Sequence, residues 1–173
     1  GCLYQNPLRG TAPNLTIEEN LALAYTRKAS PSFFALNKKD SAYFREVLST
    51  LGMGLEDRMK TKIGLLSDGQ RQAASLLMAT IAEPELLLLD EHTAALDPGA
   101  AEKVMALTKK IVEENKITTL MITHDMEYAL EYGSRTIMLD SGKIVMDLTG
   151  KEREEMTTGK LAELFYGKAH KRG

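Results

Sequence analysis

The chain has 173 residues, of which 43% are hydrophobic and 27% charged, and its formal net charge is −2. This composition is typical of a globular protein with a core of its own and excludes a disordered chain. The small net charge gives no general attraction to nucleic acid, so no nucleic-acid partner is expected. Because Cys2 is the only cysteine, an internal disulfide is impossible.

The first stretch of the chain is predicted to form a strand end, a loop and a helix. Residues 1–10 have the pattern of a strand that runs into a loop, with Pro7 and Gly10 as breakers. A helix is expected after Thr16, whose side chain can form a capping box with Glu19 three positions on.

Two further helices are predicted before residue 83. The segment KKDSAYFREVLSTLGM has apolar residues at helical spacing, with Asp40 or Ser41 as its cap. The segment QRQAASLLMATIA continues the helical pattern and should end before Pro84. The first half is therefore expected to be mainly helical.

The second half alternates between short apolar runs and amphipathic stretches. The runs ELLLLD and ITTLMIT are typical of strands that are buried on both faces. A helical pattern follows each run, and residues 135–148 alternate about a turn at 140–142, which indicates a β-hairpin. The order β-α-β-α-β-β predicts a mainly parallel sheet with helical crossovers and an antiparallel edge.

Three titratable residues follow the predicted parallel strands. Asp90 and Glu91 come directly after one apolar run, and His124 comes after the other. Ligands of parallel sheets bind beyond the carboxyl ends of the strands, so neighbouring strands would bring these residues to one crevice. One carboxylate could hold a hard cation, the other could polarise water, and the histidine could contact a phosphate. The alternative is that Asp90 and Glu91 only cap the following turn.

The segment LLSDGQRQ also has two interpretations. A serine and a glycine before a polar helix start leave free backbone N–H groups, where the helix dipole favours an anion. The alternative is a plain helix N-cap by Ser67.

Five motifs together point to a known family. YQNP, LSDGQRQ, LLLLDE, AALD and MITHD occur in this order, and the combination resembles the nucleotide-binding subunit of ABC transporters from Gln5 to about Gly150. Each motif alone is unspecific. The resemblance implies an α/β P-loop NTPase fold of the RecA-like ABC ATPase type, with a mainly parallel sheet and an α-helical subdomain.

The same resemblance divides the chain into four parts. They are a Q-loop and strand end (1–10), a helical subdomain with the signature motif (11–82), a portion of the catalytic core with the Walker B strand, D-loop and switch histidine (83–150), and a last helix with a tail (151–173).

By this resemblance, Ser67, Gly69 and Gln70 belong to a signature loop that closes over ATP held by a second subunit. Two copies would therefore meet head to tail as a homodimer. Asp97 belongs to the D-loop, which crosses the interface between them.

The resemblance also assigns the hydrolytic residues. Asp90 and Gln5 would support Mg²⁺, Glu91 would be the general base for water, and His124 would sense the γ-phosphate of ATP. Glu91 and His124 are thus the expected catalytic residues.

The implied function is ATP binding and hydrolysis coupled to solute transport. The expected partners are a transmembrane permease and a solute-binding protein, which place the chain peripherally on the cytoplasmic face of the membrane. The motifs DEHTAALDP and LLMAT resemble those of amino-acid importers. Two alternatives are a non-transport ABC ATPase of translation or DNA repair, and an interaction module without catalysis.

Three departures from the family pattern stand out. Position 68 is Asp where Gly is usual, which would weaken closure over a phosphate, and position 92 is His where Pro is usual. His92 is either a tolerated loop variant or a further titratable group near the phosphate. The phosphate-binding motif G-x-x-x-x-G-K-[ST] is absent from these residues. We therefore expect a C-terminal portion of an ABC ATPase, which alone should not hold ATP tightly.

Two groups of residues have no assigned chemistry. One group consists of aromatic residues of the helical half, namely Phe33, Phe34, Tyr43 and Phe44. Core packing is expected for them, and a groove for a permease helix is the alternative. A terminal basic group consists of Lys168, His170, Lys171 and Arg172. A solvated tail is expected, with contact to a membrane surface as the alternative.

Overall fold

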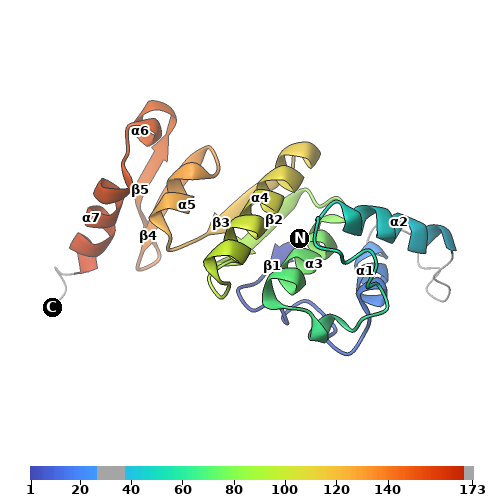
Figure 1. Ribbon diagram of the computed structural model, residues 1–173. Helices are drawn as coiled ribbons and strands as arrows, with labels where there is room; N and C mark the ends of the chain where they lie inside the picture. Colours follow the sequence, from blue (N-terminus) through green and yellow to red (C-terminus); the bar gives the residue numbers. More distant parts are fainter. Residues whose placement is uncertain (27–37, 170–173) are drawn as a thin grey trace. The chain divides into compact units, whose positions relative to one another are not determined.

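The computed structural model describes residues 1–26 and 38–169, which divide into two units, Gly1–Ile122 and Thr123–Gly173 (Figure 1). The predictions for Phe33, Phe34 and the tail from His170 onward lie outside the described residues.

The first unit contains a parallel sheet of β1 (Cys2–Leu3), β2 (Leu86–Asp90) and β3 (Thr118–Ile122), in the order β1-β2-β3. The helix α4 (Pro98–Asn115) connects β2 to β3. Parallel neighbours need such a crossover, because a tight turn joins only antiparallel strands. The predicted parallel arrangement is therefore confirmed.

Within the first unit, the described residues cover one face of this sheet and leave the other exposed. Leu3, Leu87 and Leu89 are buried beneath α4 and the helix α3 (Asp68–Thr80). On the opposite face, four apolar side chains are exposed: Leu86, Leu88, Leu120 and Ile122. Leu88 is the least exposed of them, at 37%. Burial on both faces was therefore a wrong prediction for the described residues. Side chains alternate along a strand, and only one face meets helices.

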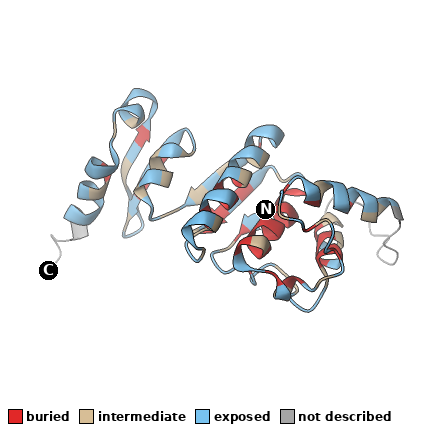
Figure 2. Ribbon diagram, in the orientation of Figure 1, coloured by how far each residue is buried: buried red, intermediate tan, exposed pale blue. Residues whose placement is uncertain are grey.

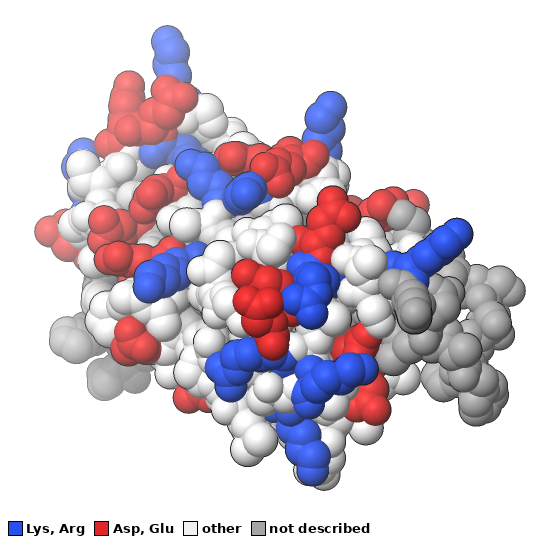
Figure 3. All heavy atoms as spheres, turned by 45° about the vertical axis from the view of Figure 1, so that its right-hand side comes forward, with Lys and Arg blue, Asp and Glu red and all other residues white. Residues whose placement is uncertain are grey.

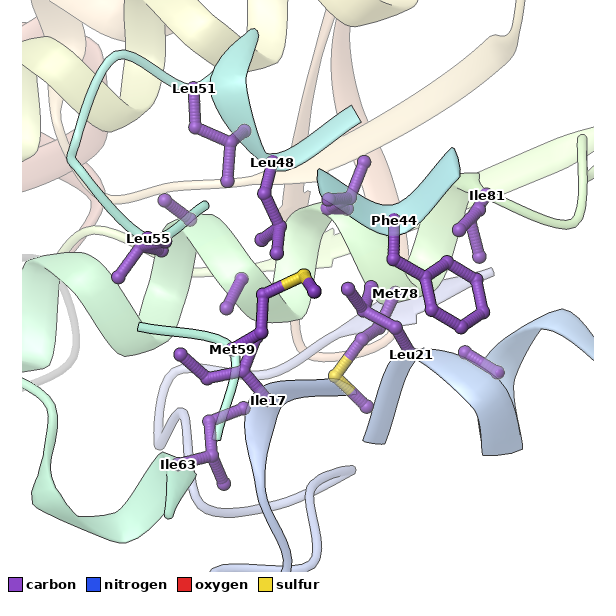
Figure 4. Close-up of a cluster of buried hydrophobic side chains, with 14 of the residues drawn as sticks. Ile17, Leu21, Phe44, Leu48, Leu51, Leu55, Met59, Ile63, Met78 and Ile81 are labelled. Atoms are coloured by element: carbon purple, nitrogen blue, oxygen red, sulfur yellow. The ribbon is translucent and has the colours of Figure 1, made fainter. Parts of the chain in front are cut away.

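The helical part of the first unit has its own core. It consists of α1 (Ile17–Tyr25), α2 (Lys38–Ser49), the 3-10 turn η1 (Ile63–Leu65) and α3. Their apolar side chains converge, as Figure 4 shows for Ile17, Leu21, Phe44, Leu48, Leu51, Leu55, Met59, Ile63, Met78 and Ile81. Phe44 is thus a core residue, as predicted. The ring of the more exposed Tyr43 lies 5.4 Å from that of Tyr25, centroid to centroid.

The helix starts agree with the prediction in one case and differ in another. Thr16 and Glu19 form the predicted capping box at α1. In α2, however, Asp40 and Ser41 lie inside the first turns, since the helix begins at Lys38. The hydroxyl of Ser41 instead donates to the buried carboxylate of Glu18, so a tertiary hydrogen bond replaces the expected cap.

The second unit consists of α5 (Met126–Glu131), β4 (Arg135–Asp140), β5 (Lys143–Thr149), α6 (Gly150–Glu154) and α7 (Thr158–Ala169). Most of its residues are exposed (Figure 2).

The strands β4 and β5 form the predicted hairpin. Ser141 and Gly142 both have positive φ, 51° and 74°, which suits a tight turn between twisted strands. Within the second unit, β4 and β5 form a two-stranded antiparallel sheet. The antiparallel edge on the parallel sheet stays a prediction.

Candidate functional site

Two of the predicted site segments leave the same edge of the parallel sheet. Leu3 pairs with Leu89, so β1 and β2 end close together. Asp90, the next residue of β2, pairs with Ile122 at the end of β3. Gln5 follows β1 by two residues, and Glu91 follows β2 directly. Gln5 and Asp90 are exposed, whereas Glu91 is partly buried. The structure therefore brings the Gln5 segment and the acidic pair to one edge.

Glu91 has an unusual backbone. Its φ is 45°, in the left-handed region that a residue with a Cβ adopts at a cost of roughly 1–2 kcal/mol. Its N–H donates to the carbonyl of Ile122 (3.0 Å), and its own carbonyl accepts from the N–H of Ala94 (3.0 Å). The strand thus turns sharply at Glu91, and adjacent hydrogen bonds hold that turn.

His92 points into the protein. Its side chain is 2% exposed, and its Nε2 lies 3.2 Å from Oγ1 of Thr108 in α4. Burial lowers the pKa of His92 to about 4, so the imidazole is neutral near pH 7. The interpretation of His92 as a further titratable group near a phosphate is therefore wrong, because the side chain is buried and hydrogen-bonded to Thr108.

The signature residues form the start of α3. Ser67 Oγ accepts from the N–H of Gln70 (3.3 Å), and Gln70 Oε1 accepts from the N–H of Ser67 (3.4 Å). The helix therefore begins at Asp68, two residues before the predicted start. This capping box is compatible with an anion at the helix start, because the amides of the first turn are not all used by it.

The start of α3 lies against the start of α4. A Cβ at Gly69 would approach the Cβ of Ala100 to 3.0 Å, so this contact favours glycine. Asp97 caps α4, with its Oδ1 accepting from the N–H of Ala100 (3.0 Å). The signature segment and the segment with Asp97 are therefore neighbours.

Asp68 is paired with a buried arginine. Its Oδ1 accepts from Nη1 of Arg71 at 2.7 Å. Arg71 also donates to the carbonyls of Ile63 (3.3 Å), Gly64 (3.1 Å) and Leu66 (2.6 Å), which fixes the loop before α3. Arg71 thus offsets part of the repulsion that an aspartate here would exert on a phosphate.

A surface cavity of about 310 Å³ joins these segments. It is lined by Gln5, Asn6, Pro7, Leu8, Asp68, Arg71 and Ala95. The cavity therefore adjoins the Gln5 loop, the signature helix and the turn that follows Glu91.

His124 belongs to the second unit and is described with it. It is exposed and precedes Asp125, whose Oδ1 accepts from the N–H groups of Glu127 (2.8 Å) and Tyr128 (3.0 Å) to cap α5. Its role beside Glu91 stays a prediction.

The sequence analysis missed three polar residues that support the site: Arg71, Gln72 and Thr108. All three are buried and make specific hydrogen bonds. They could have been found as polar residues on helix faces that are otherwise apolar, since buried polar groups need partners.

Comparison with known proteins identifies the family. The family described as "ABC transporter" matches residues 1–94, more than half of the chain. The chain belongs to the ABC transporter family. The motif-based resemblance is thereby confirmed.

Several relatives of this ABC chain carry specific names. A tyrosine transport ATP-binding protein of Clostridioides difficile (strain R20291) is 42% identical over 163 residues, 94% of this chain and 65% of that protein. A phosphonates import ATP-binding protein of Lactococcus lactis subsp. cremoris (strain SK11) is 36% identical over 155 residues, 88% of this chain and 61% of that protein. The chain thus spans less than two thirds of these relatives.

A solved structure agrees with the fold. A dimeric ATP-binding cassette in a post-hydrolysis state, bound to ADP and Pi, matches with a TM-score of 0.71 and 30% identity. The match covers 86% of this ABC chain and 62% of that one. The predicted α/β P-loop NTPase class is therefore confirmed.

Asp90 is a residue at this edge that could hold a metal ion. Within residues 1–26 and 38–169, no three His, Cys, Asp or Glu side chains converge on a metal position. Mg²⁺ commonly takes one or two carboxylates together with phosphate oxygens and water, and Asp90 is an exposed carboxylate at a strand end.

The surface carries no broad field of one charge on the face that Figure 3 displays, where acidic and basic side chains are mixed.

Over the described part of the chain, no helix has the length and apolar character needed to cross a bilayer.

Proposed function

We propose that this chain is the signature and hydrolytic portion of an ABC transporter's ATP-binding subunit, which couples ATP hydrolysis to solute transport. The observation that carries the proposal is the shared sheet edge, where Asp90 ends β2 and Glu91 follows it, beside the strand that leads into Gln5. The named relatives support it, since those named above are ATP-binding proteins of transport or import systems.

In this proposal the two acids divide the work. Asp90, with Gln5, would hold Mg²⁺, and the bound ion would supply neutralisation of charge on the phosphates. Glu91 accepts a proton from the attacking water. His124 donates a hydrogen bond to the γ-phosphate and so reports its presence.

A second copy of the subunit would complete the nucleotide site. The free amides at the start of α3, beside Ser67, Gly69 and Gln70, would face ATP held by the other copy, and Asp97 would lie at the interface. The dimeric state of the ADP-bound and Pi-bound relative supports this arrangement.

The phosphate-binding loop would come from residues outside these 173. Their sequence lacks the motif G-x-x-x-x-G-K-[ST], and the relatives are longer than this chain. The exposed apolar face with Leu88 and Leu120 would be covered by other elements of the full-length subunit. Without that loop the chain should not retain ATP.

The subunit would sit on the cytoplasmic face of the membrane, bound to a permease that receives solute from a binding protein. Amino acids are the proposed solute class. The relative named for tyrosine transport supports it at 42% identity, compared with 36% for the one named for phosphonates.

The test is ATP hydrolysis by the full-length subunit together with its permease in lipid vesicles. The replacement Glu91→Gln should abolish turnover while ATP still drives dimerisation, because the amide cannot accept the proton. Calorimetry on the 173-residue chain should detect no Mg-ATP binding.

Three outcomes would contradict the proposal. Normal turnover by Glu91→Gln would remove Glu91 from the role of base. Saturable ATP binding by the 173-residue chain would require a different phosphate site. Co-purification with ribosomes or DNA, and not with a membrane protein, would exclude transport.

A further inference from the structure

Several hydrogen bonds hold the strained backbone of Glu91 and of the residue after it. A residue with φ of 45° persists only where its surroundings determine the conformation, and such residues concentrate at functional sites. The bonds of Glu91 to Ile122 and Ala94 hold the residue itself. Two side-chain contacts hold the next residue, His92, one at its carbonyl and one at its ring.

The first contact comes from Gln72, which is fully buried in α3. Its Nε2 donates to the carbonyl of His92 (2.6 Å) and to the carbonyl of Tyr4 (3.2 Å). Tyr4 directly precedes Gln5, so a single amide group ties the signature helix to both segments of the site. Both contacts are therefore made by the NH₂ group of the Gln72 amide. Its oxygen, Oε1, has no hydrogen-bond partner among the described residues.

The second contact anchors the ring of His92 to α4. Thr108 Oγ1 donates its proton to the carbonyl of Val104 (2.8 Å), so the same oxygen accepts from Nε2–H of His92. This assigns the tautomer of His92 with the proton on Nε2. A proline at position 92 would fix the backbone through its ring, whereas the histidine fixes it through a side-chain hydrogen bond.

We propose that Gln72, His92 and Thr108 are positioning residues that hold the Glu91 turn and the Gln5 segment in register for hydrolysis. The inference rests on the proposed ATPase function. None of the three reaches the nucleotide, since all are buried; they act through the backbone on either side of the site. Loosening them should slow the chemical step more than it weakens ATP binding.

Thr108→Val tests the idea with a matched control. The substitution keeps shape and removes the acceptor for His92, and Thr108→Ser keeps the acceptor. The control is Thr80→Val in α3, since Thr80 is 7% exposed, Thr108 is 5% exposed, and each donates to the carbonyl four residues earlier. Only Thr108 also contacts His92.

In the full-length subunit, Thr108→Val should lower kcat by roughly 10-fold to 100-fold, with the KM for ATP changed less than about twofold. Thr108→Ser should restore most of kcat, and Thr80→Val should leave it unchanged. Gln72→Met, which removes both carbonyl contacts, should lower kcat at least as much as Thr108→Val.

Hydrogen exchange gives a second readout that does not need turnover. Thr108→Val should raise amide exchange in residues 88–96, whereas Thr80→Val should not. Equal kcat and equal exchange for Thr108→Val and the parent protein would overturn the inference. A parent without ATPase activity would instead refute the proposed function, and the exchange comparison alone would then decide whether Thr108 holds the turn.

Discussion

The buried imidazole of His92 predicts a specific dependence of stability on pH. Its pKa is about 4 in the folded protein because of burial, and 6.5 is the ordinary value. Above pH 6.5 the histidine is neutral in both states and contributes no pH dependence. As the pH falls from 6.5 towards 4, the unfolded chain binds a proton that the folded protein does not, so stability is lost.

The magnitude follows from the difference in pKa. Each unit corresponds to about 1.4 kcal/mol, so stability should fall by about 2 kcal/mol between pH 7.5 and pH 5. The loss should approach about 3 kcal/mol below pH 4, where both states are protonated.

Urea unfolding of the protein and of His92→Gln at both pH values measures this contribution. The Gln amide can replace Nε2–H as the donor to Thr108, but it does not titrate. The difference in unfolding free energy between the two proteins should therefore shift by about 2 kcal/mol in favour of His92→Gln at pH 5. If that difference were the same at pH 7.5 and pH 5, the histidine would titrate normally when folded and the reasoning would be refuted.

Three further pairs of substitutions test the local structure by thermal or urea unfolding. Ser67→Ala removes the cap of α3 and should cost about 1 kcal/mol, whereas Ser67→Asp should cost less because it can still cap. Arg71→Met leaves three carbonyls without their donor and should cost about 3 kcal/mol. Asp68→Asn removes the charge of an exposed carboxylate and keeps the carbonyl bonds of Arg71, so it should cost less than about 1 kcal/mol; equal losses would contradict the buried role of Arg71. Leu87→Ala should cost about 2–5 kcal/mol in the 173-residue chain, and Leu88→Ala much less. If Leu88→Ala cost as much as Leu87→Ala in the full-length subunit, other elements of that subunit would cover the face on which Leu88 lies.

Local sequence signals predicted much of the fold. The capping box at Thr16, the turn at residues 140–142 and the parallel order of β2 and β3 all follow from short patterns with a physical cause. The start of α2 was wrong because Ser41 bonds to Glu18, which lies 23 positions earlier in the chain. A capping pattern cannot reveal that a more distant partner competes for the same hydroxyl.

Burial was harder to predict than secondary structure. A run of leucines has the same appearance whether one or both faces are covered, and in β2 only Leu87 and Leu89 are buried. Which face is covered depends on the helices that pack against it, and these lie elsewhere in the chain.

The candidate site shows the same division between local and distant information. The motifs identify Asp90 and Glu91 because the chemistry needs those side chains at a strand end. They do not identify Gln72 or Thr108, which bind no ligand and show only as polar positions on buried helix faces. Glu91 adopts its left-handed backbone within a turn that is bonded to β3, α3 and α4. The geometry of the proposed base is therefore a property of the packed first unit, and a motif that contains Glu91 does not by itself ensure an active site.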